Sequence, residues 1–226
     1  ELIKNNIPDI VIFYDGVNEI ISAHQNNEAG SPTNAYNRKK EFKIGHSYKK
    51  RIKLMVYSSN LYRFVATIKR KLFTNSSYKY SSVRSDKLAT AVADNYVGLV
   101  QLSKSLENTY GFKVFNFMQP NIYSKKNLTK AEQGYYKDDQ HYENLFKLSY
   151  DTVQKDSVMI KDSTFVDISD VFDNAGKTVY FDFCHTGELG NKLVSARIFK
   201  YLKPALIAKI QESVAVLESE QLTEIN

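Results

Sequence analysis

An aspartate and a histidine lie three residues apart in the segment Asp182-Phe183-Cys184-His185. A histidine is the usual general base for a serine nucleophile, and a carboxylate beside it holds the imidazole in the correct tautomer. On one turn, these two side chains can face a single pocket. The alternative interpretation is an ordinary helix N-terminus, because a helix is expected to follow and Asp182 could simply cap it.

A second polar cluster, Asp15-Gly16-Val17-Asn18-Glu19, follows an apolar run. A carboxamide such as that of Asn18, held at the end of a strand, can donate a hydrogen bond to a developing oxyanion. Gly16 permits the backbone to turn there. The alternative interpretation is a plain turn after a strand.

The single cysteine, Cys184, excludes an internal disulfide framework. Its position beside His185 suggests a thiol nucleophile, but we expect adjacent residues in an extended turn to point apart, which makes a poor nucleophile–base pair. A buried, inert thiol is the preferred interpretation. The four histidines, at positions 24, 46, 141 and 185, lack metal-ligand spacing. We therefore expect neither a metal nor a cofactor.

Strands and helices alternate in the expected secondary structure. Strands are predicted at 10–14, 112–118 and 164–168, and helices at about 85–110, 139–155, after residue 185 and at about 204–217, with a capping box at Thr129–Glu132. This order predicts an α/β fold with a parallel sheet, whose strand carboxyl ends are where ligands bind. The segment Ile10–Tyr14 is apolar on both faces, so we expect a central strand that lacks one neighbour.

The excess of positive charge is concentrated in one segment of the chain. The net charge is +6, yet residues 38–87 carry 15 basic and two acidic residues. Residues 22–87 are interpreted as a basic insertion, with a polar loop at 22–50 and a helical stretch after it. Its surface could be merely solvated, or residues 38–87 could contact an anionic glycan, a membrane surface or a protein partner. Nucleic acid is not expected, because no recognition motif is present.

The length of 226 residues and the ordinary composition indicate one globular domain spanning residues 1–226. The first residues, Glu1-Leu2-Ile3-Lys4, do not resemble a signal peptide and look like the tail of an amphipathic helix. The cysteine content does not decide the compartment, and we favour the cell envelope or secretion over the cytoplasm.

Together, in this order, the two polar clusters resemble the SGNH (GDSL-like) hydrolase family. The segment 15–19 resembles the third block of that family, and Asp182 with His185 resembles its fifth block. Gln119-Pro120 and the stretch from Lys125 to Glu132 are similar to the strand end and loop of one bacterial branch. Glu19 stands where that block usually has an aspartate, which is a mild departure.

The resemblance implies a three-layer α/β/α, flavodoxin-like fold and hydrolysis of esters, and an O-acetyl group on a glycan is the candidate substrate. By position, His185 would be the base, Asp182 its orienting partner and Asn18 an oxyanion donor. Gly16 and Gln119 would lie at the substrate.

The nucleophile of the family cannot be placed in this sequence. In the family, the serine and an oxyanion glycine precede the strand that corresponds to 10–14, so we expect an N-terminally incomplete domain whose missing segment belongs to the same protein. Ser22, Ser31 and Ser47 lack the required glycine turn and are not assigned this role. The rival hypothesis is a non-catalytic SGNH-like module that binds a glycan, membrane or protein partner through the basic insertion.

Overall fold

The chain forms a three-stranded parallel sheet, with strand order β1-β2-β3, in a computed structural model that describes residues 7–33, 38 and 82–224. The strands are β1 (Ile10–Asp15), β2 (Lys113–Met118) and β3 (Phe165–Asp167). Ile10 is aligned with Lys113, and Asn116 with Phe165. The predicted α/β class and all three strands are thereby confirmed.

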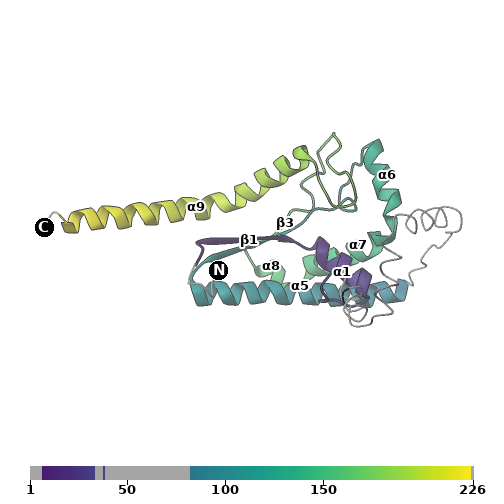
Figure 1. Cartoon of the computed structure of the whole chain (residues 1–226), viewed down its shortest axis with the longest axis horizontal. Coiled ribbons are helices and arrows are strands. Elements are labelled where there is room, and N and C mark those ends of the chain that lie inside the picture. Colours follow the sequence, from purple (N-terminus) through teal and green to yellow (C-terminus); the bar gives the residue numbers. More distant parts are fainter. Residues whose placement is uncertain (1–6, 34–37, 39–81, 225–226) are drawn as a thin grey trace, which may run out of the picture.

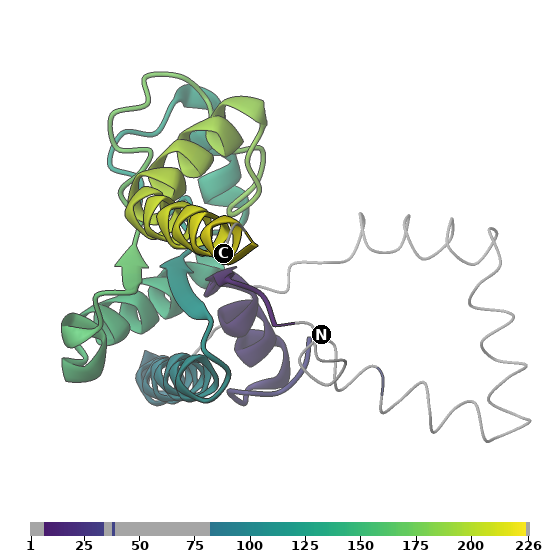
Figure 2. The same ribbon diagram turned by 90° about the vertical axis from the view of Figure 1, so that its left-hand side faces the viewer.

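Helices lie on both faces of this sheet (Figures 1 and 2). One face carries α1 (Val17–Asn26), α5 (Ser82–Tyr110), α7 (Glu143–Lys155) and α8 (Ser157–Lys161), and the other carries α9 (Glu188–Glu224). Successive residues of a strand point to opposite faces. Accordingly, Asn116 donates to the Ser103 hydroxyl of α5, whereas the Phe117 ring contacts Tyr201 of α9.

Among the described strands, β1 lies at an edge of the sheet and pairs with β2 alone, so its expected central position in a larger sheet stays a prediction. β2 is the middle strand, and Val114 and Phe117 on it are fully buried. On β1, Ile12, Phe13 and Tyr14 are 46%, 40% and 39% exposed. Within the described ranges, no strand pairs with the outer edge of β1.

Most helix boundaries match the predicted ones to within a few residues. α5 begins three residues before the predicted Ser85 and ends at Tyr110, where Gly111 takes a φ of 78° and its N–H donates to the Glu107 carbonyl. The predicted loop at 22–50 is partly wrong, since α1 continues through Asn26. The rest of the basic insertion lies outside the described residues, apart from residues 27–33, 38 and 82–87.

α9 is one continuous helix, although a new helix was predicted to begin at Pro204. Proline removes one backbone hydrogen bond inside a helix. Burial of Leu202 and the contact of Tyr201 with the sheet outweigh that loss here. The predicted helix at 139–155 is a 3₁₀ turn, η2 (Gln140–Tyr142), followed by α7, and α6 (Lys130–Asp138) precedes it. Among the described helices, none has the length and apolar character needed to cross a membrane.

Candidate functional site

The loop between β3 and α9 folds back on itself and carries Asp182 and His185 at its tip. Tyr180 and Thr186 form an antiparallel bridge across its base. The Phe181 N–H donates to the His185 carbonyl at 3.1 Å, and the Gly187 N–H donates to the Val179 carbonyl at 2.9 Å. These cross-loop bonds fix the backbone on both sides of the tip.

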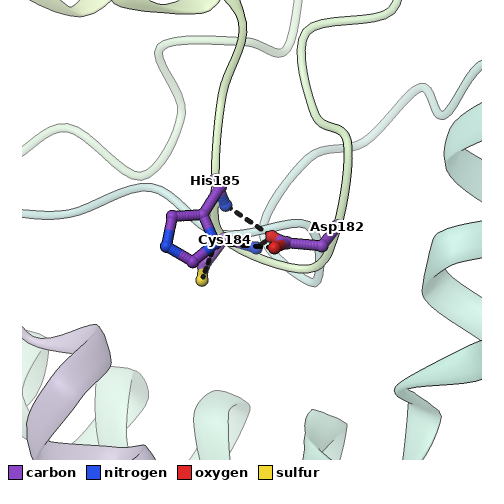
Figure 3. A group of neighbouring side chains, drawn as sticks. All are labelled: Asp182, Cys184 and His185. Carbon is purple, nitrogen blue, oxygen red and sulfur yellow. Dashed lines mark hydrogen bonds and ion pairs between the residues drawn. The ribbon is translucent and has the colours of Figure 1, made fainter.

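Asp182 and His185 face one another directly (Figure 3). Asp182 Oδ2 lies 2.6 Å from His185 Nδ1, while Asp182 Oδ1 accepts the backbone N–H groups of Cys184 and His185 at 2.8 and 2.6 Å. Asp182 is therefore held by its own turn and does not cap α9, which begins at Glu188.

The carboxyl group of Asp182 is ionised at neutral pH. Partial burial raises its pKa, but the backbone N–H groups of His185 and Cys184 and the His185 ring outweigh that effect, and the net pKa is lowered. An ionised carboxylate only accepts hydrogen bonds. The proton in the 2.6 Å contact therefore belongs to Nδ1, so a neutral His185 has its lone pair on Nε2.

The His185 ring is open to solvent, with 68% of its side chain exposed. The Phe181 ring lies nearly parallel to it, at a centroid distance of 6.0 Å and an interplanar angle of 12°. Phe181 is itself exposed. A substrate can therefore approach the imidazole alongside an apolar surface.

Cys184 does not point away from His185, which corrects the expectation from the sequence. Its sulfur lies 3.6 Å from His185 Nδ1 (Figure 3). The thiol is nevertheless buried, and burial together with the Asp182 charge raises its pKa to about 12. Because the thiolate is the reactive form, Cys184 is unreactive at neutral pH for this reason and not because of its direction.

Asp182, Cys184 and His185 place one potential metal ligand each within 4.8 Å of one another. The donors do not suit a metal centre well. Both Asp182 oxygens already accept hydrogen bonds, His185 Nδ1 is the donor to one of them, and the thiol is neutral. This arrangement is better suited to holding an imidazole than to holding an ion.

The two polar clusters meet at the carboxyl edge of the sheet. The Gln119 N–H donates to the Asp15 carbonyl at 2.8 Å, which joins the ends of β1 and β2. The Ile122 N–H donates to the Phe183 carbonyl, also at 2.8 Å, which fixes the Asp182–His185 tip beside the end of β2. Burial and the nearby Cys184 raise the pKa of Tyr14, at the end of β1, to about 12.

The remaining predicted site residues surround this junction. Gly16 has a φ of 113°, and its N–H donates to Glu19 Oε2. Asn18 is exposed on the first turn of α1, and no hydrogen bond joins it to Asp182 or His185 in the described part of the chain. Gln119 contributes its backbone here, since its carbonyl also accepts the Tyr150 hydroxyl at 2.5 Å.

A half-buried carboxyl group, that of Asp15, lies directly beside Gly16. The Oδ1 atom of Asp15 is inaccessible to solvent and has no hydrogen-bond partner among the described residues. Burial and the neighbouring Glu19 charge outweigh the opposing effect of the Tyr96 hydroxyl and raise the pKa of Asp15 to about 6. The sequence alone did not single out Asp15, because its side chain could equally have faced water.

A buried ion pair between Lys125 and Glu132 was also missed. Both side chains have no exposed surface, and Lys125 Nζ lies 2.9 and 2.7 Å from the two Glu132 oxygens. The capping box at Thr129–Glu132 is confirmed, but its spacing reveals neither burial nor a lysine partner.

No serine of the described ranges hydrogen-bonds to His185, whose Nδ1 atom contacts Asp182 and Cys184. Ser22 donates to the Ser31 carbonyl, and Ser47 lies outside the described residues. No protein-family model, curated protein or solved structure matches the chain.

Proposed function

We propose that this chain is part of an SGNH-type (GDSL-like) serine esterase, with His185 as the general base and Asp182 as its orienting carboxylate. The observation that carries the proposal is the 2.6 Å contact between Asp182 and Nδ1 of a solvent-exposed imidazole. A carboxylate in this position fixes the tautomer and stabilises the imidazolium that forms during acyl transfer.

The proposed reaction proceeds in two steps. A serine hydroxyl attacks the ester carbonyl carbon, and its proton passes to His185 Nε2. The carbonyl oxygen becomes an oxyanion, to which the Asn18 carboxamide donates a hydrogen bond. The C–O bond then breaks, and the departing alkoxide takes the proton from Nε2. Water releases the acyl group from the serine in the same way, which regenerates the enzyme.

The nucleophilic serine is proposed to come from a segment of the same protein that precedes Glu1. The outer edge of β1 supports this arrangement, because no described strand pairs with it and Ile12, Phe13 and Tyr14 are exposed among the described residues. A further parallel strand on that edge would end beside Asp15 and Gly16, and would place a residue at its carboxyl end near the His185 turn. The domain would then have the three-layer, flavodoxin-like architecture of the family.

The proposed substrate is an ester with a large alcohol group, such as an O-acetylated glycan. An imidazole that is 68% exposed can be reached by a bulky molecule, and the exposed Phe181 ring offers an apolar contact beside it. The basic segment 38–87 is proposed to contact anionic groups of such a substrate, and most of this segment lies outside the described residues.

The test is a fluorophosphonate serine-hydrolase probe applied to the full-length protein and to the 226-residue chain. We expect the full-length protein to be labelled at a serine upstream of Glu1, and the isolated chain to remain unlabelled. Mass spectrometry of the labelled peptide identifies the residue. Absence of labelling in a folded full-length protein would reject the esterase and favour a non-catalytic binding module, and strong labelling of the isolated chain would reject the upstream nucleophile.

A further inference from the structure

The buried ion pair between Lys125 and Glu132 lies beneath the loop that carries Asp182 and His185. Glu132 Oε1 accepts the backbone N–H groups of Val179 and Tyr180 at 2.9 and 3.3 Å. These residues are 47 and 48 positions away in the sequence, so the carboxylate ties two distant parts of the chain together.

The remaining bonds of the pair hold Glu132 itself in place. Lys125 Nζ donates to both Glu132 oxygens and lies 3.4 Å from the Lys177 carbonyl. The Thr129 N–H donates to Glu132 Oε2 at 2.9 Å, and the Thr129 and Thr178 hydroxyls are 2.9 Å apart. The carboxylate is therefore fixed by its lysine, by its own helix and by the loop.

Glu132 is fully ionised despite its burial. Desolvation raises its pKa, but the bonds from Lys125, Val179, Thr129 and Tyr180 outweigh it and lower the pKa to about 2. The Val179 and Tyr180 N–H groups of the loop therefore donate to an ionised carboxylate. Charge-assisted hydrogen bonds of this kind are stronger than neutral ones.

The Lys125–Glu132 pair, together with the bonds from Glu132 to Val179 and Tyr180, is called the clamp here. It acts close to the candidate catalytic pair, Asp182 and His185. Tyr180 is two residues before Asp182, and it pairs with Thr186, next to His185, across the base of the loop. A shift of the loop at Tyr180 would therefore displace the tip on both sides.

We infer that Glu132, held by Lys125, is a positioning residue that keeps Asp182 in contact with Nδ1 of His185. It contacts neither member of that pair and acts through the backbone of Val179 and Tyr180. The catalytic consequence of this inference rests on the proposed esterase function, whereas the structural consequence can be measured without any activity.

The decisive experiment compares two double variants that both remove the buried charges. Lys125→Met/Glu132→Gln keeps an amide oxygen for Val179 and Tyr180, whereas Lys125→Met/Glu132→Met has no acceptor there. Replacing both members of a buried pair avoids leaving an unpaired buried charge. Lys209→Met/Glu212→Gln, which removes the exposed Lys209–Glu212 ion pair of α9 and the 3.6 Å contact of Lys209 with Asp9, is the control.

The first measurement is the tautomer of His185 in the 226-residue chain, by NMR correlation of its ring nitrogens with the carbon-bound ring protons. In the neutral ring, we expect the proton on Nδ1 in the wild type, in the control and in the glutamine variant. In the folded methionine variant it should be shared between both nitrogens. A methionine variant with an unchanged tautomer would overturn the positioning role.

A second measurement applies if the methionine variant does not fold. Hydrogen exchange of the wild-type Val179 and Tyr180 amides should be as slow as that of the β2 core. Exchange at the rate of open loop amides would reject the clamp.

The third measurement is hydrolysis of p-nitrophenyl acetate by the full-length protein. We expect kcat of the methionine variant to fall by about 10- to 100-fold with KM nearly unchanged, because misplacement by about 1 Å costs on that order. If the wild-type protein lacks activity but the methionine variant shows the changed tautomer, the esterase is rejected and the clamp is retained. If the wild type is active and the methionine variant has the same kcat, the clamp is rejected.

Discussion

The backbone N–H of Gln119 donates to the carbonyl oxygen of Asp15 at 2.8 Å. This bond connects the carboxyl ends of β1 and β2. Asn18 follows β1 in the sequence, and Ile122, whose N–H donates to the Phe183 carbonyl, follows β2. Two clusters separated by more than 160 residues are thereby held at one edge of the sheet. Their relative position depends on the sheet and not on the loops alone.

The proposed base can be removed without unfolding the chain. In the full-length protein, we expect His185→Ala to lower the kcat/KM for p-nitrophenyl acetate by about 10²- to 10⁴-fold, the usual contribution of a general base. Its ring is 68% exposed, so the melting temperature should change little. Asp182→Asn should lower the rate as well, because an amide can present a donor to Nδ1.

The matched control for these variants is Asp170→Asn. Asp170 is an exposed carboxylate that pairs with Arg197 at 2.9 Å. Its replacement should leave kcat/KM within about twofold, since exposed ion pairs contribute little. Unchanged turnover in His185→Ala would exclude His185 as the base.

Cys184 is predicted to take no part in the chemistry. We expect Cys184→Ala to retain most of the hydrolytic activity of the full-length protein, and the native thiol to react slowly with iodoacetamide at neutral pH. The thiol is only 5% exposed and its pKa is raised to about 12. Rapid alkylation of the folded protein, accompanied by loss of activity, would instead identify a thiol hydrolase.

Two glycines should respond to alanine with opposite signs. Gly16→Ala should destabilise the chain by about 1–3 kcal/mol, because a φ of 113° is strained for a residue with a Cβ. Gly98→Ala in α5 should stabilise it by about 0.5–1 kcal/mol, since the added Cβ meets nothing within 4 Å. Urea denaturation of both variants measures these differences, and equal signs would contradict the backbone explanation.

Asp15 should make stability depend on pH between its ordinary pKa and about 6. Its folded-state pKa is raised, so in this window the folded chain binds more protons than the unfolded chain. Stability must then fall as pH rises. We expect the free energy of unfolding of the wild type, relative to Asp15→Asn, to decrease from pH of about 4 to about 7.

The control for that experiment is Asp94→Asn, which changes an exposed carboxylate of α5. The trend for Asp15→Asn should exceed the trend for Asp94→Asn across the window. A flat difference for Asp15→Asn would mean that its carboxyl group is not perturbed by burial.

Local patterns predicted the elements of this fold well. Alternation of apolar strands with helices gave the parallel sheet, Gly111 marked the end of α5, and Thr129 with Glu132 marked the start of α6. Each of these signals depends on residues that are neighbours in the sequence.

Features that depend on packing could not be predicted in this way. Pro204 was expected to begin a helix, but the contacts of Leu202 and Tyr201 carry α9 through it. The burial of Lys125 with Glu132 follows from the position of a loop almost 50 residues away. The direction of Cys184 was wrong because the Asp182 turn folds the backbone more tightly than an extended turn does.

The outer edge of β1 also has a consequence for handling the isolated chain. A strand edge that presents unpaired N–H and C=O groups beside apolar side chains is a template for pairing with another chain. Because no strand of the described ranges pairs with this edge, and Ile12, Phe13 and Tyr14 are exposed, copies of the chain should associate edge to edge as the concentration rises. The strand that supports the candidate site is therefore also the strand through which the isolated chain should self-associate and lose solubility when it is concentrated.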